Sequence, residues 1–391
     1  MSVPTAPSGV QSTYQLNVGI KLNVENVIWT ITPFDVPLLG TSGADGRTAL
    51  SSDTCFEKKI EWLDEVLLVP SSTITVNATT GDTYITISSA ASNAANLNFQ
   101  NGDVLLIDSE YMQVTDASAA TTVNTLIVTR GFLGSTAAAH TTSSIVKGVG
   151  QANPEGSDPA AARAVDRVDR YNYTQVFGPT AVQVSGSENA VQKYGLTSTE
   201  FDKQVANRIK EAFVSIEQAI LYGKAYESAG GNYRTMGGFT NYITTNVDSS
   251  TTTLSESALL TQLQACFDNG GTPDRIVVGS KQKMNLSALT GPTGATPANN
   301  AIRYAQDTNI RGQVVDYYDS DFGRQMICLD RWCRTADLFI FSRDQATVAT
   351  LRPLTFEMLA KTGDSTKGQV VGEKSLWFRK QTHAARFSAL T

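Results

Sequence analysis

The sequence contains little of what a membrane protein or a nucleic-acid-binding protein needs. No apolar run in its 391 residues approaches the roughly 20 residues that span a bilayer. Its 31 basic residues are outnumbered by 37 acidic ones, which gives a formal net charge of −6. Phosphate binding requires clustered lysine and arginine. We therefore expect no membrane insertion and no tight nucleic-acid binding.

Cysteine is scarce as well. Cys55, Cys266, Cys328 and Cys333 are irregularly spaced, and no secretory signal precedes them, so we expect free thiols in a reducing cytoplasm. Cys328 and Cys333 lack the second cysteine pair or the nearby histidine that a zinc site requires. Buried thiols are the interpretation we favour over metal ligands.

Catalytic signatures are also missing. The sequence contains no phosphate-binding GxxxxGK[ST] loop, no GxGxxG, no GxSxG and no HExxH. His140 and His383 fall in different predicted modules, and we expect surface or turn positions for them rather than a nucleophile pair. Asp316, Asp319 and Asp321 lack the calcium-loop spacing and favour a solvated loop, with a calcium contact at a subunit seam as the alternative. We expect no enzyme, no catalytic residues, no metal and no cofactor.

What the sequence does contain is one long amphipathic helix, predicted over residues 197–228. Apolar residues at 201, 205, 209, 213, 216 and 220 fall on a single stripe. Thr197 and Glu200 form a predicted capping box, and Gly230 with Gly231 is the predicted stop. Such a helix is roughly 48 Å long, which suggests a drawn-out molecule whose remaining apolar surface is covered by neighbouring copies.

Two extended segments precede this helix. Residues 55–69 alternate as a strand, with Phe56, Ile60 and Trp62 predicted on one face. Residues 171–185 alternate in the same way, and the two segments are predicted to pair as a long ribbon. Between them, Arg167 and Arg170 belong to a mixed-charge stretch, which is either a solvated edge or a set of ion pairs between subunits.

Residues 71–150 differ in composition from the rest of the chain. They contain two basic residues, no cysteine and no tryptophan, and short β-branched runs recur between turn residues. We predict a small all-β module, with strands at residues 73–76, 84–87, 104–107, 111–114 and 125–129. After the long helix we predict an α/β region over residues 237–345. The closing strands after residue 346 are predicted to pack on the apolar stripe of the helix.

The order of these parts resembles tailed-phage major capsid proteins of the Hong Kong 97-type fold. Residues 25–39 (ENVIWTITPFDVPLL) are similar to the N-terminal arm of that family. Residues 351–354 (LRPL), 359–364 (LAKTGD) and 372–373 (GE) are similar to its closing strands. The phrases GDV, EYM and VTRG, at residues 102–104, 110–112 and 128–131, resemble small β modules of phage structural proteins. The likeness is greatest to a subfamily with an insertion in the extension loop.

The resemblance implies an α+β fold and a role for each segment. The implied parts are an N-terminal arm (1–54), an extension loop (55–69 and 151–186), an inserted all-β domain (70–150), a peripheral domain (187–236 and 346–391) with a spine helix (197–228), and an axial domain (237–345). Because no long helical scaffolding segment precedes the arm, a separate scaffolding protein is expected.

The resemblance further implies a structural protein that assembles with itself, as pentamers and hexamers, into the icosahedral or prolate shell of a virion. A portal is an expected partner, and a decoration protein is a further one. Assembly is expected in the host cytoplasm, with inter-subunit contacts at Phe56, Ile60, Trp62, Trp29, Arg167 and Arg170. The alternative on the same fold is an encapsulin-like compartment. A tail or receptor-binding protein and an unknown enzyme are the more distant rivals.

Overall fold

A computed structural model gives the fold of most of the chain. It describes residues 34–40, 49–66, 69–88, 98–117, 124–156, 158, 166–193, 198–289, 317–361 and 363–391. These residues form two compact units, one from residues 1–60 with 171–391 and one from residues 61–170. The fold is α+β, as expected. None of the described helices is long and apolar enough to cross a membrane.

The long helix is α2, and it is shorter than predicted at both ends. It runs over Glu200–Tyr222, roughly 35 Å, and Thr199 caps it by accepting a hydrogen bond from the backbone of Asp202. The predicted cap Thr197 lies outside the described residues. The helix ends at Gly223, where a Cβ would lie 2.4 Å from the carbonyl oxygen of Met236, so only glycine fits this close approach.

Beyond Gly223 the chain forms a small hairpin instead of more helix. Tyr226–Glu227 (β11) pairs with Arg234–Thr235 (β12), and the predicted stop at Gly230 and Gly231 lies in its turn. The helical periodicity of the sequence ends at Ile220, and Gly223 was the breaker that the prediction passed over in favour of Gly230 and Gly231. The remaining short helices of this unit are Pro37–Leu39 (η1), Gly186–Ala190 (α1), Phe239–Tyr242 (α3), Arg343–Gln345 (η4) and Gln381–His383 (η5).

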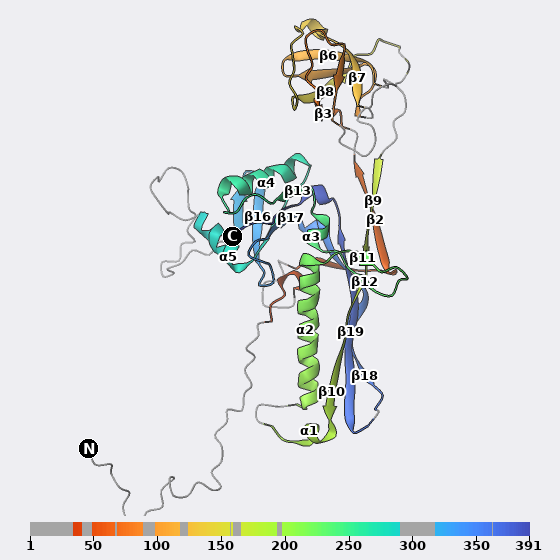
Figure 1. Ribbon diagram of the computed structural model, residues 1–391, viewed down its shortest axis with the longest axis vertical. Coiled ribbons are helices and arrows are strands. Elements are labelled where there is room, and N and C mark those ends of the chain that lie inside the picture. Colours follow the sequence, from red (N-terminus) through yellow and green to blue (C-terminus); the bar gives the residue numbers. More distant parts are fainter. Residues whose placement is uncertain are drawn as a thin grey trace, which may run out of the picture. The chain divides into compact units, whose positions relative to one another are not determined.

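A four-stranded sheet lies along α2 (Figure 1). Val182 and Val184 from the sheet pack on Phe201 of the helix, and the ring of Phe201 meets that of Phe356 edge-on at 5.8 Å. The closing strands therefore cover the apolar stripe, as the periodicity predicted. The strands, in spatial order, are Ser51–Thr54 (β1), Ala346–Leu359 (β18), Ser365–Phe378 (β19) and Gln175–Ser185 (β10).

The α/β part of the same unit is built on a six-stranded mixed sheet. Its core includes Leu259 and Leu263 of one helix, and the presence of helices beside this sheet agrees with the predicted α/β region. The helices are Glu256–Asp268 (α4) and Ser280–Leu289 (α5). The strands, in spatial order, are Asn246–Asp248 (β13), Ala385–Phe387 (β20), Leu338–Phe341 (β17), Arg275–Val278 (β14), Gly323–Leu329 (β16) and Tyr317–Ser320 (β15).

One strand of this sheet corrects the predicted division of the chain. Strand β20 comes from residues 385–387, which were assigned to the peripheral part, yet it pairs with β13 and β17. The chain end therefore crosses back into the α/β sheet, so a boundary at residues 345 and 346 does not separate two sheets. Sequence patterns locate a strand but carry no information on which sheet it joins.

The second unit contains the predicted all-β module. Its ladder closes on itself, because Ile74 forms a bridge with Ile87 between the first and last strands of the order. Strand β8 ends at Gln151, one residue beyond the predicted end of the module. Phe132–Gly134 forms a short helical turn (η3). The strands, in spatial order, are Ser71–Thr73 (β3), Ile145–Gln151 (β8), Asp103–Ile107 (β5), Glu110–Asp116 (β6), Thr125–Thr129 (β7) and Tyr84–Thr86 (β4).

A two-stranded ribbon exists, but only residues 171–173 of the predicted second strand, residues 171–185, belong to it. Lys59–Val66 (β2) pairs with Asp166–Tyr173 (β9) as a two-stranded sheet. The rest of the predicted partner, residues 175–185, is β10 and pairs with β19 instead. The alternating pattern continues across residue 174, but the tertiary structure divides it between two sheets.

Candidate assembly surfaces and buried charge clusters

The three apolar residues predicted on one face of the ribbon do not share one. Phe56 precedes the bend at residues 57–58 that leads into β2, and it is 93% exposed, whereas Ile60 and Trp62 are 5% and 9% exposed. The alternation of the strand begins at Lys59, so Phe56 lies outside the period-2 pattern. Phe56 is therefore presented to solvent, and Ile60 with Trp62 is already buried within the single chain.

The two arginines of the mixed-charge stretch form ion pairs within the ribbon. Arg167 Nε lies 2.9 Å from Glu65 Oε2, and Arg170 Nε lies 4.0 Å from Asp64 Oδ2. The Arg167 and Glu65 side chains are 62% and 44% exposed, so this pair contributes little to stability. These contacts lie within one chain, and ion pairs of this stretch with another subunit stay a prediction.

Trp29 lies outside the described residues, but the segment that follows it, residues 34–40, contacts α2. We call this segment the arm root. The rings of Phe34 and Phe213 are 6.5 Å apart, and the backbone N–H of Leu38 donates to Glu217 Oε1 at 2.8 Å. Trp332 Nε1 donates to the carbonyl oxygen of Asp35 at 2.7 Å. The arm root is therefore held between α2 and the loop after β16.

Glu217 is fully buried in the middle of α2 and was missed by the sequence analysis. Burial, together with the nearby charge of Asp330, raises the pKa of Glu217 to about 9. Burial likewise raises the pKa of Asp330 to about 6. The protonated form of Glu217 is thus the stable one at neutral pH. The sequence did offer a signal for this buried carboxyl group, because Glu217 lies next to the apolar stripe, between Ile216 and Ile220.

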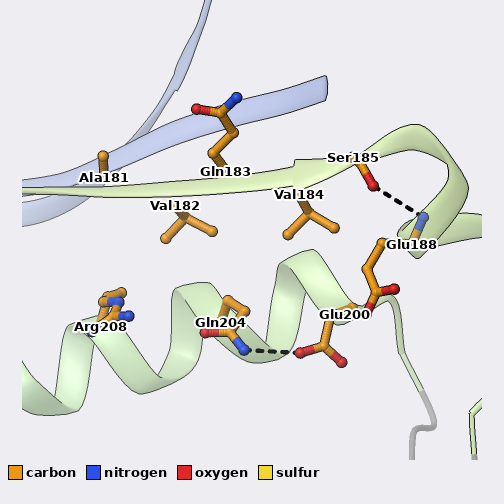
Figure 2. Close-up of a pocket in the computed structure, with 9 residues that line it drawn as sticks. All are labelled: Ala181, Val182, Gln183, Val184, Ser185, Glu188, Glu200, Gln204 and Arg208. Atoms are coloured by element: carbon orange, nitrogen blue, oxygen red, sulfur yellow. Dashed lines mark hydrogen bonds between the residues drawn. The ribbon is translucent and has the colours of Figure 1, made fainter. Parts of the chain in front are cut away.

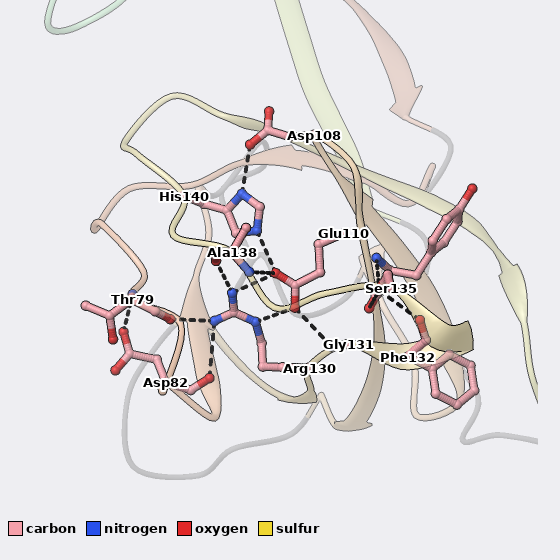
Figure 3. Close-up of polar contacts among 11 residues, drawn as sticks. Thr79, Asp82, Asp108, Glu110, Arg130, Gly131, Phe132, Ser135, Ala138 and His140 are labelled. Carbon is pink, nitrogen blue, oxygen red and sulfur yellow. Dashed lines mark hydrogen bonds and ion pairs between the residues drawn. The ribbon is translucent and has the colours of Figure 1, made fainter.

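A second buried charge cluster lies in the all-β unit (Figure 3). Arg130 donates to both carboxylate oxygens of Glu110, each at 2.8 Å, and the Glu110 side chain is 0% exposed. His140 lies between Glu110 Oε2 at 3.0 Å and Asp108 Oδ2 at 2.7 Å. His140 is 2% exposed, so its predicted place at the surface or in an open turn is wrong.

This cluster joins loops that are distant in sequence. The backbone N–H groups of Gly131 and Ala138 donate to Glu110, and Arg130 donates to carbonyl oxygens of Thr79, Asp82 and Ala138. Burial alone would raise the pKa of Glu110, but the hydrogen bonds from Arg130, the two backbone groups and His140 lower it to about 2. The module contains few charged residues, and this scarcity could have indicated that Arg130 and Glu110 form a buried ion pair.

A groove of about 470 Å³ lies between β10 and the first half of α2 (Figure 2). Val182 and Val184 point toward the helix, and Gln204 donates to Glu200 Oε1 at 2.8 Å along its other wall. Both valines already belong to the core between helix and sheet. We interpret the groove as the polar margin of that packing rather than as a substrate site.

The four cysteines are all buried and free, as predicted. Burial raises the pKa of the Cys266 thiol to about 12, and that of Cys333 likewise. Within the described residues, no cluster of histidine, cysteine, aspartate and glutamate has the make-up of a metal site. Of the acidic cluster, Asp319 pairs with Arg324 at 2.7 Å, and Asp316 lies outside the described residues.

Comparison with known proteins identifies the family. Residues 6–391 match the family described as SU10 major capsid protein. No curated protein matches the chain. Among solved structures, a chain of Microbacterium phage Oxtober96 has a TM-score of 0.48 at 10% identity, covering 97% of this chain and 99% of that one.

Two further solved structures are similar at the same level. A chain of Mycobacterium phage Bobi has a TM-score of 0.48 at 10% identity, covering 94% of this chain and 92% of that one. The capsid of Myoviridae phage XM1 has a TM-score of 0.47 at 10% identity, covering 95% and 100%. The assignment rests on the family match over residues 6–391 and not on these structural similarities: the chain belongs to the SU10 major capsid protein family.

Proposed function

We propose that this capsid subunit joins its neighbours through its arm, its ribbon and its all-β insert. The family match over residues 6–391 is the observation that makes the chain a structural shell protein of the virion, which assembles with copies of itself. In such a shell each contact is repeated by symmetry, so one exposed residue acts many times. The contacts themselves are the proposal.

The segment roles follow the same expectation. Residues 1–54 act as the arm, residues 55–69 with 151–186 as the extension loop, and residues 70–150 as a domain inserted in that loop. Residues 187–236 with 346–391, apart from β20, act as the peripheral part around α2, and residues 237–345 with β20 act as the axial part. In support, the arm root contacts α2 through Glu217, and the insert closes its own ladder.

Phe56 is the proposed anchor of the ribbon. It is the most exposed large apolar side chain of the described residues, at 93%. Burying a phenylalanine contributes about 1.5–3 kcal/mol, and a closed shell multiplies that gain by its number of subunits. Ile60 and Trp62, which are buried in the single chain, support the ribbon from within instead of contacting a neighbour.

Electron microscopy of the expressed chain tests this proposal. We expect wild type, supplied with a scaffolding protein, to form closed shells, and Phe56→Asp to remain as free subunits or small oligomers. Glu57→Gln is the matched control, because this exposed neighbour carries no apolar surface. Normal shells from Phe56→Asp would contradict the anchor, whereas failure of wild type under all conditions would count against independent assembly.

The remaining partners are part of the proposal. A separate scaffolding protein directs assembly in the host cytoplasm, a portal occupies one vertex, and a decoration protein is a further partner. We also propose that the subunit is not an enzyme. Its buried carboxylates are engaged in structural contacts, with Glu110 held by Arg130 and Glu217 by the arm root. The contents of purified shells, genome DNA or a cargo enzyme, distinguish a phage head from an encapsulin-like compartment.

A further inference from the structure

Strand β18 has an outer edge that the described residues cover only in part. Strand β1 pairs in parallel with Thr347–Thr350, and Cys55 N donates to the carbonyl oxygen of Thr350 at 3.0 Å. The chain then leaves this edge. In the part of the chain that the structure describes, no strand pairs with the outer side of β18 from residue 351 to residue 359.

The uncovered edge has two different halves. In the first, the register shifts between Thr350 and Arg352 and again between Arg352 and Thr355, and Pro353 has no N–H to donate. Bulges and prolines are the devices that keep sheet edges from pairing. In the second half, residues 355–359 pair with β19 in continuous register. The first half is therefore protected against another strand, and the second is not.

The unprotected half is also apolar at its end. Met358 and Leu359 are 66% and 41% exposed, and Glu357 is the one charged side chain among residues 355–359. Natural edge strands of this kind are otherwise blunted by lysine, proline or a covering segment. An exposed regular edge that ends in two large apolar side chains is suited to accept a further strand.

We propose that the edge at residues 355–359 binds a strand formed by residues 24–32 of a second copy of this chain. The inference rests on the shell role, because it places one arm on a neighbour's sheet. Six of these nine residues are β-branched and one is tryptophan, a composition that favours strands. Backbone hydrogen bonds to β18 supply the affinity, and alternate side chains meet Met358 and Leu359.

The length of the arm favours a second copy over the same chain. The arm root contacts α2 at Phe213, whereas the edge lies near the other end of α2, where Phe356 meets Phe201. Twelve helical residues separate these points, about 18 Å along the helix. A chain folding back on itself would use about six extended residues for that distance. Residues 28–33, including Trp29, would then be unavailable for pairing.

Disulfide trapping in assembled shells tests the pairing. Cysteine replaces Met358 together with one arm residue at a time, from Val27 to Ile31, and the four native cysteines are buried and leave a low background. Opposed residues of paired strands lie close enough for a disulfide at alternate positions. We expect crosslinks at every second arm position, running as dimers and larger ladders on a denaturing gel.

A cysteine at Val191, exposed in the same unit but away from the edge, is the matched control and should remain unlinked. Complete shells without any arm crosslink would overturn the pairing while leaving the capsid role intact. Crosslinked monomers alone would overturn the assignment to a second copy. Failure to form shells at all would instead count against the proposed assembly, so the two failures are distinguishable.

A charged edge gives a second readout that does not depend on disulfide geometry. We expect Met358→Lys with Leu359→Lys to abolish protection of residues 24–32 from protease in shells, while Val191→Lys leaves it unchanged. Lysine on an edge discourages strand pairing. Equal protection of the arm in both variants would overturn the proposal.

Discussion

Glu110 of the insert and Glu217 of α2 are both glutamates with no exposed surface, yet their pKa values are shifted in opposite directions from the ordinary value of a glutamate. Glu110 has a pKa of about 2, and Glu217 has one of about 9. Glu110 accepts from a guanidinium, an imidazole and two backbone groups. Glu217 accepts from backbone N–H groups of the arm root alone and faces the charge of Asp330.

The comparison shows that burial raises the pKa of both carboxyl groups, and that a set of donors to the carboxylate, as at Glu110, reverses the direction of the shift. In the insert, a charged cluster fixes three loops of a closed sheet. In α2, the neutral Glu217 side chain accepts hydrogen bonds from the backbone of the arm root, and no cation among the described residues pairs with it. The first arrangement makes the insert rigid and sensitive to acid, and the second makes the arm root sensitive to base.

Removing the cation of the insert should have the largest effect. Arg130→Met leaves Glu110 as an uncompensated buried charge, which costs about 3–5 kcal/mol. We expect faster hydrogen exchange throughout residues 71–150 of the full chain. Arg167→Met is the control, since its exposed pair with Glu65 is worth less than about 1 kcal/mol. Similar exchange in both variants would remove the contrast between the two glutamates.

The arm root should loosen as the pH rises. The raised pKa of Glu217 means that the folded state binds a proton which the unfolded state has lost above about 4.5, so stability is present at low pH and falls toward pH 9. At about 1.4 kcal/mol per pH unit, the loss across pH 5 to 8 should be on the order of 4 kcal/mol. Glu217→Gln should flatten this slope in urea unfolding, whereas Glu211→Gln, exposed on the same helix, should not. An unchanged slope in Glu217→Gln would contradict the assignment.

The insert should show the opposite dependence. The lowered pKa of Glu110 means that its stabilisation is complete above about 4.5 and is lost as the pH falls toward 2. The protection factors of residues 71–150, which correct for the slower intrinsic amide exchange in acid, should therefore fall between pH 4.5 and 2.5, by an amount that corresponds to about 1–2 kcal/mol. Glu110→Gln should already be destabilised at neutral pH and should lose this acid response. Acid insensitivity of wild type would break the comparison.

The smallest effect concerns the turn that Glu110 fixes. Leu133 has φ 56° and is 69% exposed, between Gly131 and Gly134, and the N–H of Gly131 donates to Glu110. This conformation costs a non-glycine residue about 1–2 kcal/mol, part of which glycine regains in the unfolded chain. Leu133→Gly should raise the stability of the insert by about 0.5 kcal/mol, whereas Leu133→Ala should not. A loss of stability in the glycine variant would show that the Leu133 side chain packs.

Sequence periodicity predicted the elements better than it predicted their partners. The stripe from Phe201 to Ile220 placed α2, and β-branched alternation placed the strands of the insert, because both patterns depend on local geometry. The same alternation joined residues 171–185 into one ribbon strand, although β9 and β10 belong to different sheets. The prediction that Phe56 shares a face with Ile60 and Trp62 was wrong for a similar reason, since a bend before Lys59 interrupts the strand alternation.

By itself, the sequence determined the α+β class, the long helix, the separate β module, the buried thiols and the family, because these follow from composition, period and ordered phrases along the chain. Only the tertiary structure decided the state of the buried charges and the pairing of the strands. Glu110, Arg130 and His140 are up to 30 residues apart, and Glu217 meets Leu38 across 179. Electrostatic partners of this kind are set by distance in space, which local sequence patterns do not encode.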